Sequence, residues 1–150
     1  MTECRRRGIR PCTDPWLLLA AVAALPVVAL LAACTPVVWS PHWPGAVALL
    51  VGVVLSPILE EIVFRTGVQD ALAARYPHRF GSLTFANTAT AVLFGLFHLW
   101  RHPPLWALAT IMPALVFGLA YERHRRLVAP IGLHAVYNLA HLALLAGVRS

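Results

Sequence analysis

Six polar residues lie in otherwise apolar stretches of this sequence, and their types and spacing suit hydrolytic chemistry. They are Glu60, Glu61, Arg65, His98, His134 and Asn138. Ionisable side chains are costly in a hydrocarbon environment and by default mark function there. Together they offer a base for water, a proton carrier and donors for a tetrahedral oxyanion, which are the parts that peptide hydrolysis requires.

The two adjacent carboxylates are predicted to play different parts. Glu61 and Arg65 are spaced i, i+4, which places them on one helix face and predicts an ion pair. Glu60 is rotated about 100° away from Glu61 and is left free for other work. The structural alternative is that Glu60 only caps the cytoplasmic end of its span.

One histidine ends the apolar run Phe94-Gly-Leu-Phe-His98. Taken alone, His98 fits a histidine satisfied at a helix interface. Asn87 lies about three turns earlier on the same face, where we expect it to line the same cavity or to bond across helices.

A second histidine, His134, is followed one turn later by Asn138, so both side chains project toward the same neighbour. His141 continues this stripe. The alternative is that these residues only hold membrane helices together by hydrogen bonding. The other histidines, His42, His78, His102 and His124, fall in predicted loops and are expected to be solvated.

The composition predicts that membrane helices position these residues. Of 150 residues, 59% are hydrophobic and 12% are charged, which is far from the average of soluble domains. Stretches long enough to cross a bilayer predict an all-α integral membrane protein with about five transmembrane helices. These stretches are Trp16–Trp39, about Gly45–Phe64, about Leu83–Trp100, Leu105–Tyr121 and about Val128–Val148.

Every basic residue is Arg, the net charge is +6, and the arginines cluster at the ends of the apolar runs. That distribution is typical of charges that orient a membrane protein and argues against nucleic acid as a partner. The positive-inside rule predicts a cytoplasmic N-terminus and an external C-terminus. Pro26, Pro57 and Pro113 lie within spans and are expected to bend them.

Two regions are predicted: residues 1–44, a basic N-terminus with the first transmembrane helix, and residues 45–150, which carry all six of these polar residues. Cys4, Cys12 and Cys34 lack the spacing of a disulfide framework or a thiolate zinc site. Leu31-Ala-Ala-Cys34 also resembles a lipobox, and cleavage before Cys34 would leave four spans. An uncleaved first helix is the favoured interpretation, because apolar residues continue through Trp39.

The depths of Glu60 and His98 conflict if the second helix ends at Phe64. We therefore expect this helix to continue through Arg65 and Gln69 to about Arg75, which places Glu60 near mid-membrane. A distance above about 10 Å from Glu60 to both His98 and His134 would undo the catalytic assignment.

At these residues the sequence resembles the CPBP (ABI) family of intramembrane proteases, which includes the CAAX prenyl endopeptidases. The motifs of that family are E-E-x-x-x-R, F-x-x-x-H and H-x-x-x-N. They match, in order, Glu60, Glu61 and Arg65, then Phe94 and His98, then His134 and Asn138. The resemblance covers about Gly45 to Val148.

The resemblance implies a role for each matched position. Glu60 would be the general base that activates water, and His98 would help to hold that water. His134 and Asn138 would stabilise the oxyanion, while Glu61 and Arg65 would act as a supporting pair. It also favours a metal-free, glutamate-dependent mechanism, with zinc held by Glu60, His98 and His134 as the alternative. No H-E-x-x-H helix is present to support zinc.

The resemblance implies that residues 45–150 form an intramembrane protease core with four helices, the catalytic core. The chain is shorter than the CAAX proteases of that family and has one helix before this core. Its length and its motif sequences look more like those of small bacterial members that process C-terminal sorting signals, including the JDVT type. Prenylated substrates are therefore not a safe inference. We expect an intramembrane endopeptidase of the bacterial inner membrane, acting near the C-terminus or membrane anchor of a membrane-anchored or exported protein. The alternatives are a non-catalytic scaffold or immunity-type protein and a small proton-coupled transporter.

Overall fold

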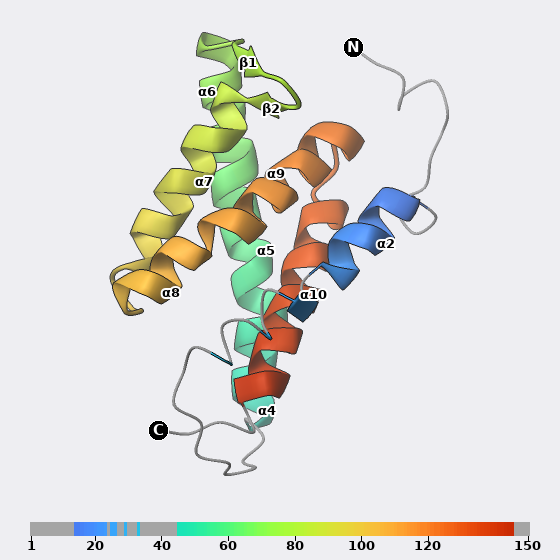
Figure 1. Cartoon of the computed structure of the whole chain (residues 1–150), viewed down its shortest axis with the longest axis vertical. Helices are drawn as coiled ribbons and strands as arrows, with labels where there is room; N and C mark the ends of the chain where they lie inside the picture. Colours follow the sequence, from blue (N-terminus) through green and yellow to red (C-terminus); the bar gives the residue numbers. More distant parts are fainter. Residues whose placement is uncertain (1–13, 24, 27–28, 30–32, 34–44, 146–150) are drawn as a thin grey trace.

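The computed structural model describes residues 14–23, 25–26, 29, 33 and 45–145, and is helical throughout except for one short hairpin (Figure 1). The possible cleavage site at Cys34 and the region from 34 to 44 lie outside the described residues, as do residues 146–150. Of the predicted first span, the structure describes α2 (Pro15–Val22) and a few residues after it.

The second predicted span forms one continuous helix over Ala46–Arg75, 30 residues long. It consists of α4 (Ala46–Leu49), the π-helix η2 (Leu50–Leu55), α5 (Ser56–Glu61), the π-helix η3 (Ile62–Gln69) and α6 (Asp70–Arg75). The prediction that it continues to about Arg75 is confirmed. The i→i+5 bonds of π-helices are rare and often occur at functional sites. Here they flank the short α-helical segment that carries both glutamates.

Two short strands, β1 (Arg79–Phe80) and β2 (Leu83–Thr84), pair antiparallel and lead into α7 (Phe85–His98). Gly81 supplies the positive φ of 61° in the turn between them. The hydroxyl of Thr84 caps α7 by accepting from the backbone N–H of Asn87. At 14 residues α7 is shorter than the predicted third span.

The fourth predicted span is interrupted at Thr110, between α8 (Pro104–Ala109) and α9 (Ile111–His124). Pro113 explains the interruption, because its ring crowds the carbonyl of Ala109 and it has no N–H to donate. The last helix, α10, covers Val128–Leu145. Within the described residues, Ala46–Arg75 and Pro104–His124 are the helices long and apolar enough to cross a membrane.

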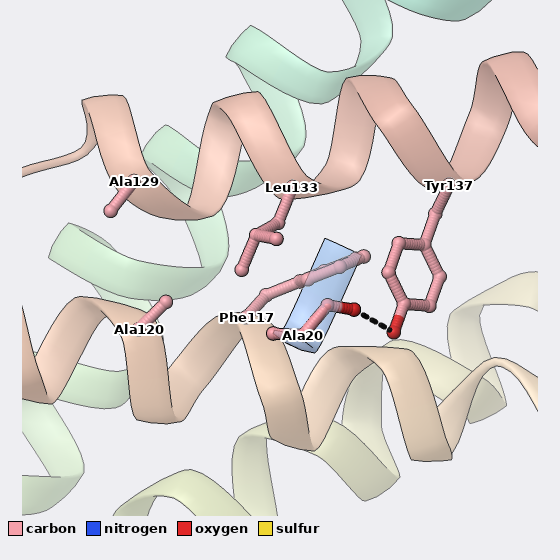
Figure 2. Close-up of a cluster of buried hydrophobic side chains, with 6 residues drawn as sticks. All are labelled: Ala20, Phe117, Ala120, Ala129, Leu133 and Tyr137. Atoms are coloured by element: carbon pink, nitrogen blue, oxygen red, sulfur yellow. Dashed lines mark hydrogen bonds between the residues drawn. The ribbon is translucent and has the colours of Figure 1, made fainter. Parts of the chain in front are cut away.

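The helices pack as a bundle in which α7 and α9 lie side by side and α10 packs against both α9 and the long helix (Figure 1). Helix α2 rests on α10. Figure 2 shows the buried cluster formed there by Ala20, Phe117, Ala120, Ala129, Leu133 and Tyr137. The hydroxyl of Tyr137 donates to the carbonyl of Ala20 over 2.9 Å, which ties α2 to the core.

The cytoplasmic end predicted from the arginines is held together by polar contacts. Tyr121 donates to the carboxylate of Asp70 over 2.7 Å, and Arg125 lies 3.9 Å from it. Asp14 is 1% exposed and accepts from Nε of Arg123 over 2.6 Å. The prediction that His124 is solvated is wrong. Its side chain is 2% exposed, and its Nε2 lies 3.1 Å from the carboxylate of Asp14, the N-cap residue of α2.

Candidate active site

The pair predicted from the i, i+4 spacing is present and fully buried. Nε of Arg65 donates to Oε2 of Glu61 over 2.7 Å, and both side chains are 0% exposed. A buried ion pair needs further hydrogen bonds to offset its loss of hydration. Arg65 has them, since Nη1 donates to Gln69 and Nη2 to the carbonyl of Ala114.

His134 of α10 lies against both glutamates. Its Nδ1 donates to Oε1 of Glu61 over 2.9 Å, and its Nε2 lies 3.8 Å from Oε2 of Glu60. The limit of about 10 Å set from the sequence is therefore met by His134. Because each oxygen of Glu61 has a partner, this carboxylate is fixed between Arg65 and His134.

Glu60 differs from Glu61 in having an uncommitted carboxylate. Its side chain is 24% exposed, and its buried Oε2 has no hydrogen-bond partner among the described residues. The 3.8 Å to His134 exceeds a hydrogen bond. A carboxylate beside an imidazole and free of direct bonds is a group that can accept a proton from a third molecule.

His98 contacts Phe94, whose ring lies near His134. Its Nδ1 donates to the Phe94 carbonyl over 2.8 Å, and its ring lies 4.4 Å from the Phe94 ring, which in turn lies 5.8 Å from His134. His98 makes no hydrogen bond to Glu60 or Glu61 in the described part of the chain. The ring of Phe94, the first residue of the F-x-x-x-H motif, thus contacts the imidazole of His98 and lies near that of His134.

Asn138 is placed one turn beyond His134, and its Nδ2 donates to the carbonyl of Gly52 over 2.7 Å. The π-helical register explains this contact. Ser56 donates to Val51, five residues earlier, so the next N–H in that register belongs to position 57 and would meet Gly52. Pro57 has no N–H, and the Asn138 amide replaces it.

Three further polar residues considered in the sequence analysis form no hydrogen bond or ion pair with Glu60 or Glu61 in the described residues. His141 packs against Trp106 with ring centroids 5.1 Å apart. Asn87 is fully buried, and its Nδ2 donates to the carbonyl of Leu115 over 3.1 Å. The expectation that Asn87 bonds across helices is therefore confirmed. His102, expected to be solvated, is exposed but also stacks on His98 at 5.8 Å.

The sequence reasoning missed three polar residues that continue the network from Arg65. They are Gln69, Glu122 and Thr84. Gln69 continues the i, i+4 stripe of Glu61 and Arg65, a signal that was available. Nothing in the sequence indicated that Glu122 and Thr84 would meet it.

The three residues named for zinc do not form a metal-binding group in this structure. Over the described ranges, no set of three or more His, Cys, Asp or Glu side chains is arranged to hold a metal ion. Of the three, Glu60 and His134 lie 3.8 Å apart, and Nδ1 of His98 donates to the Phe94 carbonyl.

Comparison with known proteins identifies the family. Residues 41–140, two thirds of the chain, match the family model described as type II CAAX prenyl endopeptidase Rce1-like. Comparison with curated proteins and with solved structures finds no match. The matched range contains both glutamates, Arg65, both motif histidines and Asn138 in the order noted above. On this match, the chain belongs to the Rce1-like family of CAAX-type membrane endopeptidases.

Proposed function

We propose that this protein is an intramembrane endopeptidase that cuts a peptide bond near the C-terminus or membrane anchor of a protein substrate. The observation that carries the proposal is the position of His134, with one ring nitrogen bonded to Glu61 and the other 3.8 Å from the uncommitted Glu60. Arranged this way, a free carboxylate can take a proton from water beside a nitrogen aimed at the same space.

In this proposal Glu60 is the general base, and His98 helps to hold the water it activates. His134 stabilises the oxyanion through Nε2–H when both of its ring nitrogens carry a proton, because Nδ1–H is already donated to Glu61. Asn138 keeps one amide proton after its bond to Gly52, and that proton is the second oxyanion donor. Glu61 and Arg65 hold His134 in its orientation.

We further propose the glutamate-dependent form of the reaction. Its support is that Glu60, which has no hydrogen bond in the described residues, belongs to no described cluster of three or more His, Cys, Asp or Glu side chains that could hold a metal ion. Metal analysis of purified, active protein tests this. Stoichiometric zinc, with activity lost on chelation and restored by zinc, would overturn it.

The membrane arrangement is also a proposal: about five spans in the bacterial inner membrane, with the N-terminus cytoplasmic. It is supported by the arginine distribution and by the contacts that bring Asp70 and Arg125 to one end of the bundle. As substrates we propose proteins with C-terminal sorting signals, including the JDVT type, and the proposal does not extend to prenylated proteins.

The test compares cells that carry wild type, Glu60→Gln or Asp70→Asn, with mass spectrometry of membrane-protein C-termini. Asp70→Asn is the matched control, since it makes the same chemical change on the same long helix away from His134. Processed C-termini are expected to disappear in Glu60→Gln and to persist in the control. Unchanged C-termini in Glu60→Gln would favour a scaffold, and proton-dependent flux in liposomes without cleavage would favour a transporter.

A further inference from the structure

Arg65 is held by more than its partner in the motif. Its Nη1 donates to Oε1 of Gln69 over 2.8 Å, one turn further along the long helix. Gln69 is 2% exposed, so this contact is buried. The orientation of the guanidinium, and with it of Glu61, therefore depends on where the Gln69 oxygen lies.

The amide of Gln69 is itself fixed from the other side. Its Nε2 donates to Oε1 of Glu122 over 3.0 Å and to the carbonyl of Gly118 over 3.4 Å. The same oxygen of Glu122 accepts from the hydroxyl of Thr84, the residue that caps α7. An unbroken run of hydrogen bonds thus connects the start of α7, the end of α9 and the long helix.

This run ends at the proposed active site. From Arg65 it passes to Glu61 and from Glu61 to His134 of α10. We infer that Gln69 is a positioning residue that acts through Arg65 and Glu61 on His134, and that Glu122 fixes the direction of its amide. The inference rests on the proposed function for its effect on turnover.

The chemistry of this position requires glutamine. The side chain must accept from a guanidinium and donate to a carboxylate at the same time, which an amide does and a carboxylate does not. Glutamate at position 69 would still accept from Arg65 but would face Glu122. Methionine, of similar length, would do neither and would leave Nη1 of Arg65 buried without an acceptor.

The experiment compares Gln69→Met, Gln69→Glu and the double variant Gln69→Glu/Glu122→Gln with wild type in liposomes. The double variant reverses the donor and acceptor between positions 69 and 122 while keeping the total charge. The probes are quenched peptides that carry a JDVT-type C-terminal sorting signal, together with farnesylated and unprenylated CAAX peptides. Thr66→Val is the matched control, because Thr66 is exposed and its hydroxyl bonds only to Ile62 of its own helix.

Gln69→Met is expected to lower kcat about 10-fold, as for the loss of one charge-assisted bond, with KM unchanged. Gln69→Glu is expected to be similarly impaired, and the double variant to recover to within about 3-fold of wild type. Recovery of kcat in the double variant would show that the residues at positions 69 and 122 act as a hydrogen-bonded pair, and not that each substitution impairs the enzyme separately. If Gln69→Met does not fold, the inference is tested by comparing kcat of Gln69→Glu with kcat of the double variant.

A second measurement is independent of cleavage. In protein labelled with ¹⁵N-histidine, the His134 ring signals are assigned by their loss in His134→Gln. They are expected to move in Gln69→Met and to stay in place in Thr66→Val. Turnover and His134 signals like wild type in Gln69→Met, in an enzyme that Glu60→Gln inactivates, would overturn the inference. If wild type cleaves no probe but the signals move, the proposed function fails and the positioning by Gln69 stands.

Discussion

Nδ1 of His134 donates to Oε1 of Glu61 over 2.9 Å, at a point where neither side chain meets solvent freely. The other oxygen of that carboxylate accepts from Arg65. One buried carboxylate therefore holds a guanidinium from its own helix and an imidazole from α10. Both oxygens of Glu61 are therefore bonded, whereas Oε2 of Glu60 has no hydrogen-bond partner in the described residues.

Replacing Glu61 by Gln is expected to destabilise the protein by about 3 kcal/mol, because it leaves the Arg65 charge buried without its counter-ion. Glu60→Gln, which breaks no hydrogen bond, is expected to stay within about 0.5 kcal/mol of wild type. Unfolding of detergent-solubilised protein measures both. Glu61→Gln/Arg65→Met removes the charge as well and should recover part of the loss. Equal stability of the two single variants would contradict the assignment.

Gly118 is required where α9 passes the buried network. A β-carbon at this position would lie 1.8 Å from Oδ1 of Asn87 and 2.9 Å from Nη1 of Arg65. Gly118→Ala is therefore expected to cost about 2 kcal/mol of stability and to lower cleavage.

The matched control for this substitution is Gly67→Ala on the long helix, where a β-carbon meets nothing within 4 Å. It is expected to cost no stability and to raise the unfolding free energy by up to about 1 kcal/mol, because alanine favours a helix over glycine. Similar losses in the two variants would show that the crowding at Gly118 is relieved at little cost.

Asn138 has two tasks that can be separated through Pro57. Asn138→Ala leaves the Gly52 carbonyl without a donor, at a cost of about 1–3 kcal/mol, and removes the proposed oxyanion donor. Adding Pro57→Ala returns a backbone N–H to the long helix. The double variant is expected to regain stability while cleavage stays about 100-fold below wild type. Thermal unfolding and peptide cleavage are measured on the same samples, and activity that returned with stability would remove Asn138 from the chemistry.

Asp14 is expected to make stability depend on pH. The hydrogen bond from Arg123 lowers the pKa of Asp14 below its ordinary value of 3.8, with the Trp16 N–H and the charges of Arg123 and His124 acting the same way against a smaller opposing effect of burial. Between the lowered pKa of the folded state and about pH 4, the unfolded chain binds more protons than the folded chain. The stabilisation by the Asp14 carboxylate is therefore present above about pH 4 and is lost as the pH falls through the lowered pKa.

The measurement is thermal unfolding between pH 7 and pH 3, for wild type and Asp14→Asn. The variant lacks the Asp14 carboxyl but keeps the neighbouring Arg123 and His124. The advantage of wild type is expected to shrink toward pH 3. An advantage of wild type that stays constant across the range would contradict the lowered pKa.

What the sequence determined by itself is the set of features that depend on nearby residues. The i, i+4 spacing predicted the Glu61–Arg65 pair, and a conflict of depth predicted that the second helix continues to Arg75. Both are confirmed. The order of three short motifs within apolar runs predicted the family, which the match over residues 41–140 confirms. Such features are readable because helix geometry relates neighbours in sequence to neighbours in space.

What the tertiary structure alone decided is which distant groups meet. His134 bonds to Glu61 across 73 residues, Asn138 to Gly52 across 86, Gln69 to Glu122 across 53 and Arg123 to Asp14 across 109. Helix periodicity gives the face on which a side chain lies but not the rotation and shift of one helix against another. Those are set by the packing of whole surfaces, and at that step Asn138 reaches the carbonyl that Pro57 leaves without a donor and Gln69 joins the active-site network.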